Sequence, residues 1–208
     1  MILKFPARIT LMRRDPTELR RALTRLAARQ AGHFTAAQAL AIGYSYPAQH
    51  YHTRRGEWLR IDRGIYRLSD WPVTPYEDLV RWVLWSHGQG TISHDTALTV
   101  HELGDAMPAL VHLTVPPGFR ATAPAVRLHT ALVDRADMEQ HEGFTVTSPL
   151  RSILDVAAAG MDIDQLARTI DDALERGQMT IGHLRTRADE LGAHAALAVE
   201  RALRELGR

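Results

Sequence analysis

Residues 43–68 have the sequence GYSYPAQHYHTRRGEWLRIDRGIYRL, in which signals for a helix are followed by signals for a β-hairpin. Ser45 is a favourable helix N-cap, and Pro47 suits the first turn of a helix, where a missing N–H costs little. Gly56 can end that helix. Two short runs rich in β-forming residues then flank an Asp-Arg-Gly turn at residues 62–64. The stretch therefore predicts a helix followed by a hairpin.

The residues before this stretch predict two more helices. Thr35 can cap a helix with the sequence AAQALAI, and Gly43 can end it in a left-handed turn. Gly32 separates that helix from an earlier one. The earlier helix has apolar residues at the i, i+3, i+4, i+7 and i+8 spacing of a buried stripe, at Leu19, Ala22, Leu23, Leu26 and Ala27. The order helix, helix, tight turn, helix, hairpin is that of a winged helix-turn-helix, which we place at residues 15–70.

The net charge of +1 hides a division of charge along the chain. Residues 1–70 hold 13 Lys or Arg and 5 Asp or Glu, a net charge of +8, whereas residues 71–208 hold 12 and 19, a net charge of −7. A basic segment can neutralise phosphates and release their counterions, so duplex DNA is its expected partner. Residues 1–14 include Lys4, Arg8, Arg13 and Arg14 and are expected to form a basic N-terminal arm.

The third predicted helix should present one face to the core and another to DNA, because side chains follow each other at 100° around a helix. Ala48 and Tyr51 are the better core residues, with His52 and Arg55 on their side. The opposite face carries groups that can hydrogen-bond base edges or phosphates, and the wing adds three arginines. A small shift in helix phase would instead bury Gln49. The predicted DNA-binding residues are Tyr46, Gln49, His50, Thr53, Arg54, Arg60, Arg63 and Arg67.

Residues 73–208 predict a mixed α/β domain with a helical C-terminus, which makes the fold class α+β. Residues 74–77 (Thr-Pro-Tyr-Glu) suggest a capping box for its first helix, and Ser93 can cap the second. Ser148 and Pro149 can open a further helix. We expect strands at residues 110–115, 126–133 and 144–147, the first two separated by a Pro-Pro-Gly turn, and final helices at 164–176, 181–191 and 194–206.

No catalytic residue is predicted. The chain has no cysteine, which excludes a cysteine nucleophile and a zinc-thiolate site. Ser93, His94 and Asp95 are consecutive, so a helix would point them in different directions and they cannot form a triad. Asp162 and Asp164 resemble half of a two-metal carboxylate site, but no glycine-rich phosphate loop accompanies them. They precede a helix, where acidic residues favour the positive dipole end, so a capping role is the expectation. The only lysine is Lys4, so a nuclease of the restriction-endonuclease type lacks its catalytic lysine.

No metal site or other cofactor is predicted either. His94 and His101 are seven residues apart on one expected helix, and His112 and His129 lie on expected strands. None of them has the close ligand spacing of a motif such as HExxH, so capping, half-buried or surface positions are the expectation. No stretch is long and apolar enough to suggest a signal peptide or a membrane helix, and we expect a cytoplasmic protein without a membrane partner.

Several segments together resemble the AbiEi family, the antitoxins of type IV toxin–antitoxin systems. Residues 43–68 resemble its N-terminal winged helix. TISHDTALTVHELGD (91–105), VHLTVPPG (111–118) and GFTVTSPLRSILDVA (143–157) resemble the second domain of the antitoxin, and the resemblance spans roughly residues 17–176. It implies a winged helix that represses the antitoxin–toxin operon at repeats in its own promoter. It further implies a second domain that counteracts a co-encoded, nucleotidyltransferase-like toxin.

One position departs from this resemblance, since many members have an aliphatic residue where this chain has Gln49. Either Gln49 contacts DNA or the third helix packs differently. Some relatives join the winged helix to a nuclease-like domain, but the missing lysine speaks against that here. The sequence thus predicts a non-enzymatic, DNA-binding transcriptional autorepressor and antitoxin. The alternative is an antitoxin or adaptor that binds its target protein directly through the acidic second domain, with DNA binding secondary; whether the toxin is contacted directly stays open.

Overall fold

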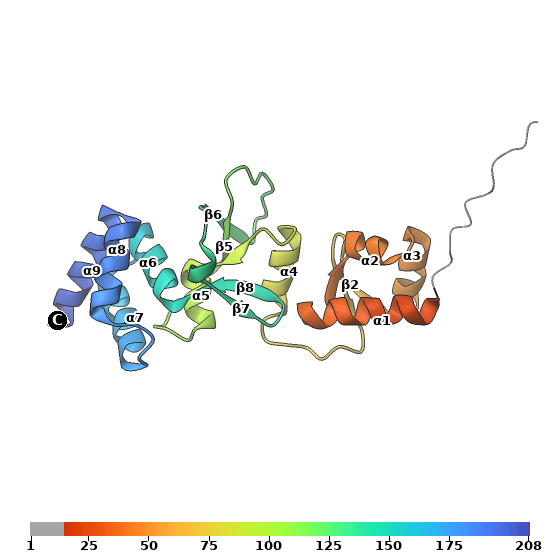
Figure 1. Ribbon diagram of the computed structural model, residues 1–208, viewed down its shortest axis with the longest axis horizontal. Helices are drawn as coiled ribbons and strands as arrows, with labels where there is room; N and C mark the ends of the chain where they lie inside the picture. Colours follow the sequence, from red (N-terminus) through yellow and green to blue (C-terminus); the bar gives the residue numbers. More distant parts are fainter. Residues whose placement is uncertain (1–14) are drawn as a thin grey trace, which may run out of the picture. The chain divides into compact units, whose positions relative to one another are not determined.

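The computed structural model describes residues 15–208, and the chain divides into two compact units, Met1–Pro72 and Val73–Arg208. The basic arm expected at residues 1–14 lies outside the described residues. Figure 1 shows that the first unit combines short helices with a small sheet, and that the second unit joins a larger sheet to a bundle of C-terminal helices. The predicted α+β class is confirmed, with a winged helix-turn-helix first and a helical C-terminus last.

The first unit has the predicted order of elements. Its helices are α1 (Pro16–Ala27), α2 (Ala36–Ile42) and α3 (Tyr46–Arg54), and the hairpin consists of β2 (Trp58–Asp62) and β3 (Ile65–Leu68). Thr35 and Gln38 form a reciprocal capping box at the start of α2, and the Ser45 hydroxyl accepts a hydrogen bond from the Ala48 N–H at the start of α3. A strand that the sequence did not predict, β1 (His33–Thr35), pairs antiparallel with β3, so that the sheet order is β1-β3-β2.

The core of this unit is aromatic, and it fixes the wing against the helices. Phe34 and Trp58 are buried, and their ring centroids lie 4.8 Å apart in an edge-to-face arrangement. Tyr44, in the turn before α3, meets Trp58 edge-on at 5.0 Å, which ties the turn of the helix-turn-helix to β2. Leu23 and Ala27 of α1 complete the cluster.

Gly32 is a position where only glycine fits. Its φ is +82°, and a Cβ there would overlap the side chain of Trp71. We expect Gly32→Ala to lower the free energy of unfolding by about 2–4 kcal/mol, from left-handed strain plus displacement of the indole. Gly56→Ala is the matched control, since its φ is +72° and a Cβ there would meet nothing within 4 Å. It should cost only about 1 kcal/mol. Urea unfolding measures both, and equal losses would contradict the packing argument.

The second unit is built on a five-stranded mixed sheet of order β6-β5-β4-β8-β7. Two pairs of neighbours in this sheet are parallel, β5 with β6 and β4 with β8. The strands are β4 (Thr91–Ile92), β5 (Val111–Val115), β6 (Val126–Thr130), β7 (Met138–His141) and β8 (Phe144–Thr147). The helices are α4 (Glu77–Trp85), α5 (His94–Val100), α6 (Pro149–Ala159), α7 (Ile163–Glu175), α8 (Ile181–Leu191) and α9 (Ala193–Glu205), and short 3-10 turns span Ala28–Gln30 in the first unit and Arg135–Asp137 in the second.

Helices α5 to α9 share one apolar core, which explains the helical C-terminus. Leu154, Leu166, Ile170, Leu184 and Leu203 are almost fully buried and belong to a single cluster. Burial of each of these side chains stabilises the fold by about 1.5–3 kcal/mol, so this apolar cluster is the main interaction that holds the helices together.

The same unit also buries an ion-pair network. The guanidinium of Arg151 lies 2.8 Å from Asp155 and 3.0 Å from Asp137. Asp137 in turn contacts Arg187 at 2.8 Å, so the network joins α6 to α8. Because each buried charge here has an opposite partner, the network is explained without a ligand.

Three local expectations in this unit are wrong. The capping box at Thr74 is absent, because α4 begins only at Glu77 and its N-cap, Tyr76, makes no side-chain capping bond. Ser93 stands at the N-cap of α5, but its hydroxyl contacts His94 and Thr114 instead of capping the helix. The expected turn between the strands now named β5 and β6 is a longer crossover, since the two strands are parallel. By contrast, Asp162 does cap α7, as predicted.

Candidate nucleic-acid interface

Helix α3 has a different phase from the one expected. Gln49 is only 3% exposed, whereas Tyr51, expected in the core, is 55% exposed. The half-buried Ala48, His52 and Thr53 lie on the side of Gln49. The exposed face is therefore formed by Tyr46, His50, Tyr51, Arg54 and Arg55.

Gln49 is a structural residue, and the expectation that it faces solvent is wrong. Its side-chain amide donates hydrogen bonds to the carbonyl oxygens of Ala36 and Tyr44, both at 3.1 Å. These two carbonyls lie at the start of α2 and in the turn before α3, so one amide ties the two helices of the motif together. A polar side chain can take a core position when its hydrogen bonds are satisfied there. Of the two alternatives left open for Gln49, contact with DNA or a different packing of the third helix, the structure shows the different packing.

Replacing Gln49 should affect stability more than DNA recognition. We expect Gln49→Ala to lower the free energy of unfolding by about 2–4 kcal/mol, because it leaves a cavity and removes the partner of two carbonyls. His50→Ala, on the exposed face of the same helix, should change it by at most about 0.5 kcal/mol. Chemical denaturation of both variants measures the difference. An unchanged stability of Gln49→Ala together with altered base preference would restore the original assignment.

The two arginines that end α3 have different surroundings. The Arg55 Nε donates to Glu57 at 2.8 Å, and the His52 Nδ1 lies 2.6 Å from the same carboxylate. These hydrogen bonds, from His52 first and then Arg55, hold the pKa of Glu57 below its usual range. Arg54 is exposed and has no ion pair within residues 15–208. Arg54 is therefore the cation of α3 whose charge is not already compensated by a carboxylate.

Two of the three wing arginines are exposed. Arg60 lies on β2, and Arg63 lies in the turn at the tip of the hairpin, where its N–H donates to the Asp62 carboxylate at 2.6 Å. Arg67 is only 8% exposed, so the expectation that it offers its guanidinium to DNA is wrong. It lies on β3, the central strand of the small sheet, between His33 and Leu59 of the neighbouring strands.

Most, but not all, of the predicted DNA-binding residues are therefore exposed to solvent. Tyr46, His50 and Arg54 are exposed on α3, and Arg60 and Arg63 are exposed on the wing. Thr53 is half-buried, and its hydroxyl donates to the carbonyl of Gln49 at 2.8 Å. Tyr51, which the sequence analysis placed in the core, is exposed, and so is Arg55, which it placed on the same side of the helix.

Comparison with known proteins finds a family that matches most of the first unit. Residues 21–69 match the family model described as "Transcriptional regulator, AbiEi antitoxin". The N-terminal winged helix is therefore similar to that of AbiEi antitoxin regulators. The resemblance noted from residues 43–68 is thereby confirmed. The match covers α1 from its second turn, α2, α3 and the whole hairpin. The description of that family names a regulator and no enzymatic activity.

The fold also resembles a solved structure along most of the chain. The RV2827C protein from Mycobacterium tuberculosis matches with a TM-score of 0.55 and 15% sequence identity, over 91% of this chain and 78% of that one. At this identity the likeness shows a shared fold. No curated protein gives a significant match. Within residues 15–208, no helix combines the length and apolar character needed to cross a bilayer.

Proposed function

We propose that the protein is a transcriptional autorepressor that binds repeats in its own promoter, and an antitoxin that counteracts a co-encoded, nucleotidyltransferase-like toxin. The observation that carries the first part is the exposed face of α3, which joins the uncompensated Arg54 to Tyr46 and His50 in a unit of AbiEi type. The second element of a helix-turn-helix enters the major groove, where arginine and histidine can hydrogen-bond base edges.

The wing supports the same proposal. Arg63 lies at the tip of the hairpin, and Arg60 lies on the strand that leads to it. From there the two side chains reach the phosphates or the minor groove beside α3. The proposed DNA-binding residues are therefore Tyr46, His50, Thr53, Arg54, Arg60 and Arg63, without the buried Gln49 and Arg67.

Loss of Arg54 and loss of Arg63 should have different consequences. Arg54→Ala should cost about 1–3 kcal/mol on the specific site and relax base preference at one position. Arg63→Ala should weaken specific and random duplexes by the same factor, because it removes a contact to the backbone. Fluorescence anisotropy with promoter DNA and with a scrambled duplex measures both ratios. Arg201→Ala, an exposed arginine of α9, is the matched control and should leave both affinities unchanged.

Two results would contradict this assignment. The first is that Arg54→Ala weakens binding to promoter and scrambled DNA equally, which would make Arg54 a phosphate contact. The second is that neither variant changes either affinity, which would mean that the exposed face of α3 and the wing are not the DNA-binding surface.

The second candidate function is direct binding of the toxin through residues 73–208, with DNA binding secondary. It is favoured by the net charge of −7 over residues 71–208, which could meet a basic partner protein and would repel nucleic acid. A pull-down of the purified chain with the product of the neighbouring gene distinguishes a direct antagonist from one that acts through transcription alone.

A further inference from the structure

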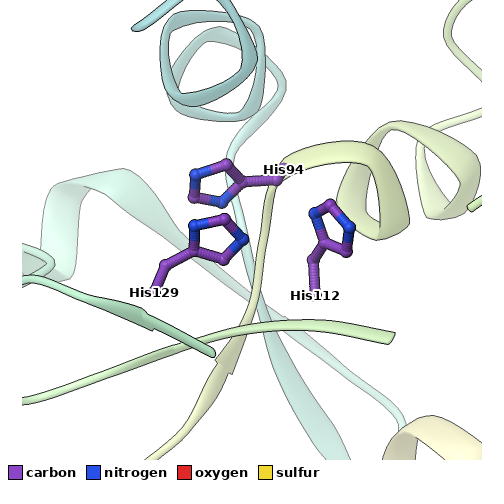
Figure 2. Close-up of side chains that lie close together, drawn as sticks. All are labelled: His94, His112 and His129. Atoms are coloured by element: carbon purple, nitrogen blue, oxygen red, sulfur yellow. The ribbon is translucent and has the colours of Figure 1, made fainter. Parts of the chain in front are cut away.

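Three histidines that are far apart in the sequence meet in the second unit. His94 is the first residue of α5, His112 lies on β5 and His129 lies on the adjacent parallel strand β6. Figure 2 shows their imidazole rings gathered on one side of the strands, with His94 and His129 nearly parallel to each other. One nitrogen from each ring lies within 4.8 Å of the other two.

Two of the three rings have a polar neighbour at Nδ1, a hydrogen-bonded hydroxyl for His94 and a nearby carboxylate, without an aligned hydrogen bond, for His112. The Nδ1 atom of His94 hydrogen-bonds with the Ser93 hydroxyl at 3.0 Å, and Thr114 donates to that hydroxyl at 2.7 Å. The Nδ1 atom of His112 lies 3.1 Å from a carboxylate oxygen of Asp95. Both rings therefore have Nε2 left for another ligand, and a carboxylate behind a histidine is the usual outer partner of a metal-bound imidazole.

The third ring has a buried nitrogen without a partner. The Nε2 atom of His129 is shielded from solvent and makes no hydrogen bond within residues 15–208. A buried polar atom left unpaired costs about 1–3 kcal/mol, which calls for an explanation at this position. His94 adds a second cost, because its φ is +52°, in the left-handed region that non-glycine residues rarely adopt.

The backbone fixes the position of the cluster. The Ser93 N–H donates to the carbonyl of His112 at 3.2 Å, and the Thr96 hydroxyl accepts from the N–H of His112 at 2.9 Å. The start of α5 is thus attached to β5, and β6 is aligned with β5 along its whole length, from Val126 to Thr130. A ligand between the rings would join a helix end, an inner strand and the edge strand of the sheet.

We propose that His94, His112 and His129 bind one divalent transition metal ion of the zinc class. Three neutral imidazoles with an outer carboxylate match the donor set that zinc prefers in proteins. Burial lowers the pKa of His94 to about 3 and that of His129 to about 4, so both rings are uncharged at neutral pH, the form that binds metals.

Two features of the surroundings set the conditions for binding. Tetrahedral ligands with Zn–N bonds of about 2.0–2.1 Å are roughly 3.3 Å apart, so the nitrogens must move closer together and the stacked rings, with centroids at 3.4 Å, must rotate. Arg127 lies opposite His112 on β6, and its positive charge opposes a cation. Asp95 beside His112 compensates that charge, and the nearby Arg151 is already paired with Asp155 and Asp137.

The test uses the full chain without a histidine tag, freed of metal by a chelator. Titration calorimetry with zinc chloride should give one equivalent, and cobalt(II) should give the visible absorption of a tetrahedral complex. His129→Ala removes a ligand and should weaken zinc binding by more than about 100-fold, whereas Asp95→Asn should weaken it by about 10–100-fold. Zinc should raise the thermal midpoint of the wild type and leave that of His129→Ala unchanged.

Two control variants locate the ion. His183→Ala changes an exposed histidine of α8 and should bind as the wild type does. His141→Ala tests a second group, His101, Glu139 and His141, which also has metal-ligand spacing. That group is the weaker candidate because the Nε2 of His101 already contacts the Thr147 carbonyl oxygen at 2.7 Å. Zinc binding that is lost in His141→Ala and kept in His129→Ala would overturn the proposal.

The absence of a saturable zinc equivalent in the wild type would also overturn it. If His129→Ala does not fold by circular dichroism, ¹⁵N spectra of the wild-type imidazoles replace it. Zinc should then shift the nitrogens of His94, His112 and His129, and shifts confined to other histidines would refute the site.

Discussion

Raising the salt concentration from about 50 to about 200 mM should weaken duplex binding by residues 1–72 by about 10²- to 10³-fold. Each phosphate that a cation neutralises releases a counterion, so the logarithm of the affinity falls with that of salt with a slope of about −0.9 per contact. The net charge of +8 over residues 1–70 supplies the cations. Arg54, Arg60 and Arg63 are exposed in the described part, and about four to six contacts in all give the stated range.

Gel-shift or anisotropy titrations of this fragment at four salt concentrations measure the slope. Residues 73–208 are the control, and their negative charge predicts no binding at any of these concentrations. Replacement of both Arg60 and Arg63 by alanine removes two proposed phosphate contacts and should reduce the magnitude of the slope by about 1.8. A flat dependence on salt would show that this unit does not bind DNA through phosphates.

Several helix starts were predicted correctly because their signals are local, although the side-chain caps expected at Thr74 and Ser93 do not form. Thr35, Ser45 and Asp162 cap α2, α3 and α7 through bonds to N–H groups two or three residues along. The predicted range 181–191 is the range of α8. The sequence analysis missed β1 and β4, which have three residues or fewer and so cannot show a period of two. It also missed β7, whose sequence MEQH is poor in β-forming residues. The existence of β1 and β4 depends on partners far along the chain.

Hydrophobicity alone could not predict which residues of α3 face the core. Tyr51 is the more apolar residue, yet Gln49 takes the buried position because Ala36 and Tyr44 present carbonyl groups to its amide. Those acceptors exist only once α2 and the turn are in place. Whether a polar side chain is buried thus depends on hydrogen-bond partners in the tertiary structure, which cannot be read from the sequence.

The histidine cluster could not be found by motif spacing for a similar reason. His94, His112 and His129 are separated by 18 and 17 residues, whereas zinc motifs on one element have ligands a few residues apart. They meet because β5 and β6 are parallel neighbours and the start of α5 is bonded to β5.

Truncation after residue 72 should keep DNA binding and abolish protection from the toxin, even when expression is driven by an unrelated promoter. The reason is that residues 73–208 form a compact unit with its own core and a net charge opposite to that of the winged helix. Repression cannot protect when the toxin is transcribed from a promoter that the protein does not recognise. Survival of cells that carry the toxin with the full chain, with residues 1–72 or with an empty vector measures the effect.

A double variant separates antagonism by binding from metal-dependent catalysis at the paired carboxylates. Asp162 accepts hydrogen bonds from the N–H groups of Asp164 and Gln165 at 3.1 and 3.2 Å, so its role is that of a helix cap. Asp162→Ala with Asp164→Ala should therefore cost about 1 kcal/mol of stability and leave protection intact. In the truncation experiment, protection by residues 1–72 alone would show that the second unit is not the part that counteracts the toxin. Loss of protection in the folded double variant would contradict a role limited to capping and would return a metal-dependent enzyme to consideration.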